Sequence, residues 1–146
     1  MEKIYDPQAV GAWVEKSRYR MELERWKPQL MLLRYEKGEL VTSPMPDERL
    51  VVVQGSLNIY LIRDDGGCYS LSSGKTDYLL GDMELFHSGG NSIYTEAAQP
   101  LLCLALSINR NREALLADNL FLQMICQSLT EKMATITALD AAPGSL

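Results

Sequence analysis

The stretch of this sequence best suited to binding chemistry is LLGDMELFHSGGNS, residues 79–92. Gly81 and Asp82 form a turn ahead of one short helical turn that includes Met83 and Glu84, and a loop of small polar residues follows. A glycine before a helix start leaves backbone N–H groups free to face a ligand, which is typical of an anion-binding turn. The stretch contains no Lys or Arg, so it has the shape of an anion site without the cation.

Other chemistries lack the residues they need. His87 is the only histidine, and its place in this loop does not make a Ser-His-Asp or Cys-His pair credible. One histidine cannot supply a His-rich metal cluster of the cupin kind, and we favour a solvated turn residue over a haem ligand. Cys68, Cys103 and Cys126 are fewer than the four thiolates of an iron-sulfur cluster. Cys103 and Cys126 lie in apolar runs and are expected to be inert core residues, whereas Cys68 follows a Gly-Gly turn and is the redox candidate. We predict no enzyme, no metal and no cofactor.

The length and charge of the chain restrict the kinds of molecule that it is expected to bind. A chain of 146 residues fits one domain. The formal charge is −5, and residues 51–108 hold two cations, Arg63 and Lys75, against six carboxylates. Nucleic acids require clustered cations, so a partner of this middle segment is expected to be small and neutral or cationic. The apolar runs are too short to span a membrane and no secretory leader opens the chain, which predicts a cytoplasmic protein.

Local patterns place the turn within a β-rich domain. Asp6 and Pro7 predict a helix start, and residues 6–26 read as one or two helices with a buried stripe at Val10, Trp13 and Val14. Strand patterns follow over residues 28–44, around a Lys-Gly turn, and over 50–61. A DDGG hairpin then leads to a return strand, and further strands cover 92–97 and 101–107. Short strands with Gly-rich turns predict an antiparallel roll or barrel.

The last third is helical over residues 109–140, with a break expected at 117–119, where Asp or Asn can cap a new helix. Apolar residues of the second helix are spaced by three or four, close to a coiled-coil seam. The predicted seam for pairing two copies of the chain consists of Leu122, Ile125, Leu129, Met133 and Ile136.

In order and spacing, these features resemble the cyclic-nucleotide-binding-domain superfamily, in particular the sensor domain of Crp/Fnr-type transcription regulators. The resemblance rests on YEKGELV (35–41), LVVVQGSLNIYL (50–61), DDGG, LLGDMELF (79–86) and the strand-and-helix stretch 101–133. It implies a mainly β fold with flanking helices. An N-terminal helical segment (1–27) precedes an antiparallel β-roll of jelly-roll type (28–108), and helices including a long dimerisation helix (109–140) close the domain.

The same resemblance assigns a degenerate ligand pocket. Family members that bind cyclic nucleotides use a Gly-Glu step and an Arg ten residues after the Glu, which fall here on Gly81-Asp82 and on Ser92. Serine cannot neutralise a phosphate, and Ile93 and Tyr94 stand where small side chains are preferred, so we predict that cAMP and cGMP do not bind. The implied pocket residues are Gly81, Asp82, Met83, Glu84, Ser92, Ile93 and Tyr94.

The resulting functional prediction is a homodimeric sensor domain that binds an uncharged or cationic effector. It would reach DNA only through a helix-turn-helix domain that is not in this chain, which predicts a piece of a longer regulator. The alternative is a scaffold or interaction module that keeps the roll and the dimer helix and has lost ligand sensing.

Overall fold

The structure, a computed structural model, describes residues 1–41, 49–62, 65–73, 76–82, 85–86 and 93–141. The N-terminal elements are β1 (Glu2–Ile4), α1 (Pro7–Lys16), α2 (Arg20–Glu24) and the 3-10 helix η1 (Lys27–Gln29). The sheet strands are β2 (Met31–Tyr35), β3 (Arg49–Gln54), β4 (Leu57–Ile62), β5 (Cys68–Ser73), β6 (Thr76–Leu80), β7 (Ile93–Ala97) and β8 (Leu101–Ser107). Helices α3 (Ile108–Leu116) and α4 (Asn119–Ala141) end the described chain.

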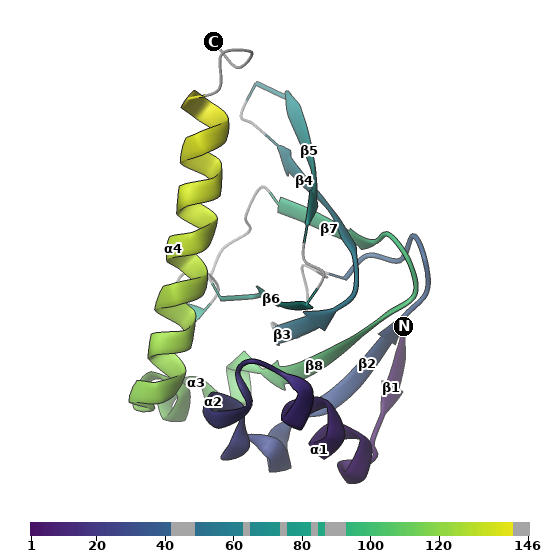
Figure 1. Ribbon diagram of the computed structural model, residues 1–146, viewed down its shortest axis with the longest axis vertical. Coiled ribbons are helices and arrows are strands. Elements are labelled where there is room, and N and C mark those ends of the chain that lie inside the picture. Colours follow the sequence, from purple (N-terminus) through teal and green to yellow (C-terminus); the bar gives the residue numbers. More distant parts are fainter. Residues whose placement is uncertain (42–48, 63–64, 74–75, 83–84, 87–92, 142–146) are drawn as a thin grey trace.

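The strands form two antiparallel sheets, which confirms the predicted mainly β fold with flanking helices. The larger sheet has five strands in the order β1-β2-β8-β3-β6, and the smaller has three in the order β5-β4-β7. Helices α1 and α2 lie against one face of the larger sheet, and α4 rises along the side of the roll (Figure 1). No helix within the described ranges is both long and apolar enough to cross a bilayer.

Strand β8 is buried on both faces because it separates two apolar cores. Leu104 and Leu106 belong to the core between the large sheet and the helices. Cys103 and Ala105 belong to the core inside the roll. Alternate side chains of a strand point to opposite faces, so the continuous apolar run of this strand serves both cores.

In the N-terminal segment the predicted helix start is confirmed, but the prediction for the residues before it is wrong. Asp6 caps α1 by accepting from the N–H groups of Gln8 and Ala9 at 3.0 and 3.4 Å. Residues 2–4, however, are not helical as predicted for segment 1–27, because they form β1 and pair with β2. Edge pairing supplies partners that so short a segment cannot find within itself.

Two further segments differ from their sequence patterns. After the Lys37-Gly38 turn, residues 39–41 form an isolated bridge, from Leu40 to Glu96, and the rest of the predicted second strand, residues 42–44, lies outside the described residues. Residues 76–80 form β6, a strand that the pattern does not predict, and β6 pairs with β3 across an irregular register at Val53 and Gln54. This strand carries the chain directly into the Gly81 turn.

Asp77 holds β6 against the N-terminal helices. It is buried, has a φ of 57°, and accepts hydrogen bonds from the Ser17 hydroxyl, the Arg18 N–H and the Gln54 amide. A non-glycine residue at positive φ is unfavourable unless its surroundings hold it there, and these three donors do so. The strand that precedes the turn is therefore fixed at its first residues.

Candidate functional site

The candidate site is the junction between the Gly81 turn and helix α4. Gly81 has a φ of 89°, and a Cβ added to it would lie 2.1 Å from the carbonyl oxygen of Arg49. Only glycine fits this position, because the backbone conformation and the contact with β3 both exclude a side chain. The turn is thus pressed against the large sheet, and the next residue, Asp82, faces α4.

Asp82 is the buried acid of the junction, with 1 % of its surface exposed. Its carboxylate accepts from the Ser128 hydroxyl at 2.6 Å and from the Lys132 ammonium at 2.8 Å to each oxygen. A buried carboxylate without such partners would be strongly destabilising, so the two α4 residues make this position possible. The turn and the long helix are linked by charge as well as by packing.

Lys132 has further acceptors on the roll. Its ammonium donates to the carbonyl oxygen of Leu79 at 2.6 Å and lies 5.1 Å from the ring centroid of Tyr78. The side chain is 18 % exposed, so its aliphatic part is largely packed and its charged end is held inside the junction. Every one of these acceptors comes from residues 78–82.

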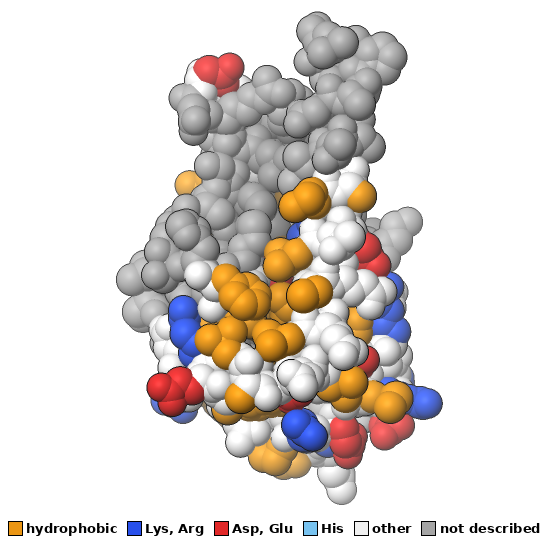
Figure 2. Space-filling model, turned by 90° about the vertical axis from the view of Figure 1, so that its left-hand side faces the viewer, with side chains coloured by type: hydrophobic (Ala, Val, Ile, Leu, Met, Phe, Trp, Pro, Cys, Tyr) orange, Lys and Arg blue, Asp and Glu red, His pale blue; other side chains and the backbone are white. Residues whose placement is uncertain are grey.

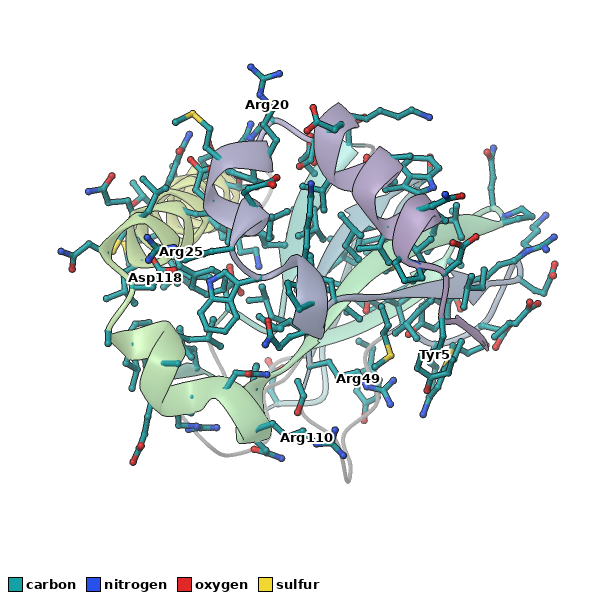
Figure 3. All side chains as sticks on the ribbon, turned by 90° about the horizontal axis from the view of Figure 1, so that it is seen from below. Tyr5, Arg20, Arg25, Arg49, Arg110 and Asp118 are labelled. Atoms are coloured by element: carbon teal, nitrogen blue, oxygen red, sulfur yellow. The ribbon has the colours of Figure 1, made fainter. Side chains whose placement is uncertain are left out.

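Helix α4 is fixed a second time at its start. Asp118 accepts from the Phe121 N–H at 3.1 Å and from the Trp26 indole at 2.9 Å, and Arg25 lies 3.5 Å away. Figure 3 shows Arg25 and Asp118 side by side where α3 meets α4. Burial alone raises the pKa of Asp118, but these hydrogen bonds and the Arg25 charge outweigh it, so the pKa lies below its ordinary value. The predicted break at 117–119 is confirmed.

The exposed flank of α4 carries an apolar stripe. Leu122 and Leu129 are partly buried, Cys126 is exposed, and Met133 is 69 % exposed. Their spacing of four, three and four residues places them on one side of the helix. Figure 2, which faces α4, shows apolar side chains gathered along this side of the molecule.

The sequence matches no protein-family model and no curated protein. Solved structures are similar. Oxidised CprK in complex with o-chlorophenolacetic acid aligns with a TM-score of 0.60 and 21% identity, over 82% of this chain and 50% of that one. The N-terminal domain of a transcriptional regulator from Streptomyces coelicolor aligns at 0.54 and 18%, over 86% and 87%. A cAMP-binding acyltransferase from Mycobacterium smegmatis aligns at 0.58 and 16%, over 70% and 34%.

These likenesses identify the architecture. The fold is that of a cyclic-nucleotide-binding domain. This is the fold that the sequence resemblance implied, and the chain spans about a third of the acyltransferase and half of CprK.

Within this cyclic-nucleotide-binding fold, the predicted pocket is only partly described. Gly81 and Asp82 form the turn as predicted, but Asp82 is already engaged by Ser128 and Lys132. Met83, Glu84 and Ser92 lie outside the described residues, as does His87, and Ile93 is described only as the first residue of β7. The replacement of a phosphate-binding Arg by Ser92 therefore stays a prediction.

Tyr94 does not fill the interior as predicted. It is 48 % exposed, whereas its neighbour Thr95 is fully buried. Adjacent residues of a strand face opposite sides, and Thr95 takes the inward one. The Tyr94 side chain thus lies on the outer face of the small sheet.

The conclusion that the turn lacks a cation is also wrong. Residues 76–109 contain no Lys or Arg, but Lys132 reaches the turn from α4, across fifty residues of sequence. A sign of it was present in the sequence: Ser128 and Lys132 are polar residues four apart, on the same helix face as the buried Phe121 and Met124. Polar residues at inward positions need partners, and Asp82 is that partner.

The predicted seam and thiols need corrections as well. Ile125 is 0 % exposed and belongs to the core of its own chain, so it is not available to a second copy. Cys126 takes its place on the exposed stripe and is not a core residue. Cys103 is buried as predicted, and burial raises the pKa of its thiol to about 12. The side chains of Ile136 and Cys68 lie outside the described residues.

Proposed function

We propose that this chain is the effector-sensing and dimerisation domain of a Crp/Fnr-type transcription regulator, in which an effector acts on the contact between the Gly81 turn and α4. The observation that carries the proposal is the Asp82–Lys132 ion pair with Ser128 beside it. This ion pair joins the Gly81 turn to α4. The family resemblance assigns the turn to the ligand pocket, and α4 is the helix proposed to pair two subunits. The neighbours named as transcriptional regulators support the regulatory class over an enzyme.

The mechanism is a shift between two arrangements of the junction. In one, Asp82 holds Lys132 and α4 lies against the roll. In the other, an effector occupies the turn, the ion pair opens and α4 changes its angle. Because the effector binds the two arrangements with different affinity, it changes their populations, and DNA-reading domains beyond α4 would respond.

The effector proposed from the turn is uncharged or cationic, and cAMP and cGMP are not ligands. Lys132 does supply a positive charge, but Asp82 neutralises it at 2.8 Å. A cyclic phosphate would have to break this pair and then lie beside the freed, buried carboxylate, where like charges repel. Isothermal titration calorimetry with both nucleotides is expected to give no heat of binding. A micromolar dissociation constant for either would refute this part of the proposal.

The dimer is proposed to form through the α4 stripe of Leu122, Cys126, Leu129 and Met133. Light scattering is expected to give the mass of two chains, and Leu129→Asp is expected to give one. Gln123→Asp, an exposed change on the same helix outside the stripe, is the matched control and should leave the dimer intact. An unchanged dimer mass for Leu129→Asp would exclude this interface.

The scaffold alternative is favoured by one observation: the buried polar groups of the junction satisfy each other within the chain. A domain without an effector needs such internal partners. Native mass spectrometry of the purified protein separates the two functions. A small molecule retained at one per chain favours the sensor, and its absence together with no thermal shift across an amine and neutral metabolite panel favours the scaffold.

A further inference from the structure

The acceptors around the Lys132 ammonium all belong to one short segment of the roll. The Leu79 carbonyl oxygen lies at 2.6 Å, both Asp82 carboxylate oxygens lie at 2.8 Å, and the Tyr78 ring centroid lies at 5.1 Å. The cation comes from a different element, α4. The roll thus provides all the contacts that an ammonium group needs. The ammonium group that binds there, Lys132, belongs to α4 and not to the roll.

The chemistry of this set matches a primary ammonium. Such a group has three N–H donors, and three oxygens face it at hydrogen-bonding distance. The ring of Tyr78 adds the attraction of an aromatic face for a cation. Distances of 2.6 to 2.8 Å require N–H donors, which a quaternary ammonium lacks.

Other ligand classes fit these contacts less well. An anion would meet the Asp82 charge, which is 1 % exposed and little screened by water. A neutral group could not replace the ion pair that the Asp82 carboxylate makes with an ammonium group. Calcium prefers about six to eight oxygens, more than this segment offers.

We propose that the Tyr78–Asp82 segment is a binding site for the primary ammonium group of an amine ligand, a site that Lys132 fills when α4 lies against the roll. This inference rests on the proposed function in one respect, that the junction is where an effector acts. Lys132 is a tethered competitor whose effective concentration is in the millimolar range or above. A natural amine effector must therefore make further contacts in the roll to displace it.

The test removes the Lys132 side chain by mutation and supplies an equivalent amine in solution. Lys132→Ala removes three carbons and the nitrogen, which are the heavy atoms of n-propylammonium. Urea unfolding of the full chain, followed by circular dichroism, is measured with and without n-propylammonium chloride. At about ten times its dissociation constant, the amine is expected to raise the folding equilibrium constant of the variant roughly tenfold. Sodium chloride, tetramethylammonium chloride and n-propanol at equal concentration are expected to leave it unchanged.

The matched control is the double variant Asp82→Asn with Lys132→Ala, which keeps the space and removes the carboxylate. The amine should not stabilise it. If the Lys132→Ala chain does not fold without the amine, circular dichroism still tests the proposal. Adding n-propylammonium must then restore the helical signal. No gain with the amine, or an equal gain in the double variant, would overturn the ammonium site.

These outcomes are separate from those that test the regulator. A dimeric protein that shows no rescue loses the amine site and keeps the proposed sensor and dimerisation role. A monomeric protein that shows rescue keeps the amine site and loses the dimer.

Discussion

The Asp82–Lys132 pair gives the most direct quantitative prediction, because it links the Gly81 turn to α4. Lys132→Met keeps an unbranched side chain, one heavy atom shorter, and removes its charge. Breaking a buried pair from one side costs about 3–5 kcal/mol, because the other charge stays buried. Ser128 still donates to Asp82, and Lys132 is partly exposed, so we expect about 3 kcal/mol of lost unfolding free energy, at the low end of that range.

The partner variant completes a double-mutant cycle. Asp82→Asn leaves Lys132 its carbonyl acceptor on Leu79 and is expected to cost about 2 kcal/mol. In the double variant neither charge remains buried, so its cost should fall short of the two single costs together by about 2 kcal/mol. Urea unfolding followed by far-ultraviolet circular dichroism measures all four proteins. Lys37→Met, at an exposed turn, is the control and should change stability by less than about 0.5 kcal/mol.

Two results would refute this reasoning. If Lys132→Met lies within about 0.5 kcal/mol of the wild type, the ion pair contributes nothing and the turn is not held to α4 by charge. If the single costs simply add, the two residues act independently and the junction is not a coupled unit.

Three further predictions concern the turn, the thiols and the start of α4. Gly81→Ala is expected to cost at least about 2 kcal/mol in urea unfolding, because its φ of 89° is strained for alanine and the new methyl meets a backbone carbonyl. In the monomer expected for Leu129→Asp a thiol reagent should modify Cys126 within minutes and spare Cys103, which is buried with a pKa of about 12; rapid labelling at Cys103, mapped by mass spectrometry, would contradict the burial. Asp118 has a lowered pKa when folded, so its contribution is present above its unfolded pKa of about 3.9 and is lost as pH falls through the folded value. Asp118→Asn should therefore lower stability at neutral pH and approach the wild type in acid, and a pH-independent difference would count against the charge.

Local chemistry explains why much of the fold was predictable. The Asp6 cap, the break before α4 and the hairpin after β4 each depend on residues within six positions of one another, so the sequence shows both partners of each contact. The alternation at the start of β4, where Leu57 and Ile59 are buried and Asn58 and Tyr60 are less so, likewise needs only the two-residue period of a strand. Such elements can be predicted without knowing which distant residues they contact.

The errors fall where a distant partner decides the structure. β1 and β6 are strands because β2 and β3 offer edges to them, not because of their own patterns. Lys132 reaches the turn because the roll places Asp82 beside α4, and Ile125 turns inward because its core neighbours lie there. Spacing along a helix gives its faces but does not say which face the rest of the chain will cover.

The two anchors of α4 have a further consequence for how the junction responds. The helix is held at Asp118 and again at Lys132, fourteen residues on, which corresponds to about 21 Å along its axis. A tilt of roughly ten degrees about the first anchor would carry the second by about 4 Å, more than the whole 2.8 Å separation of its ion pair. Lever-arm geometry of this kind makes the contact sensitive to helix angle, because a tilt of that size is enough to break the Asp82 ion pair.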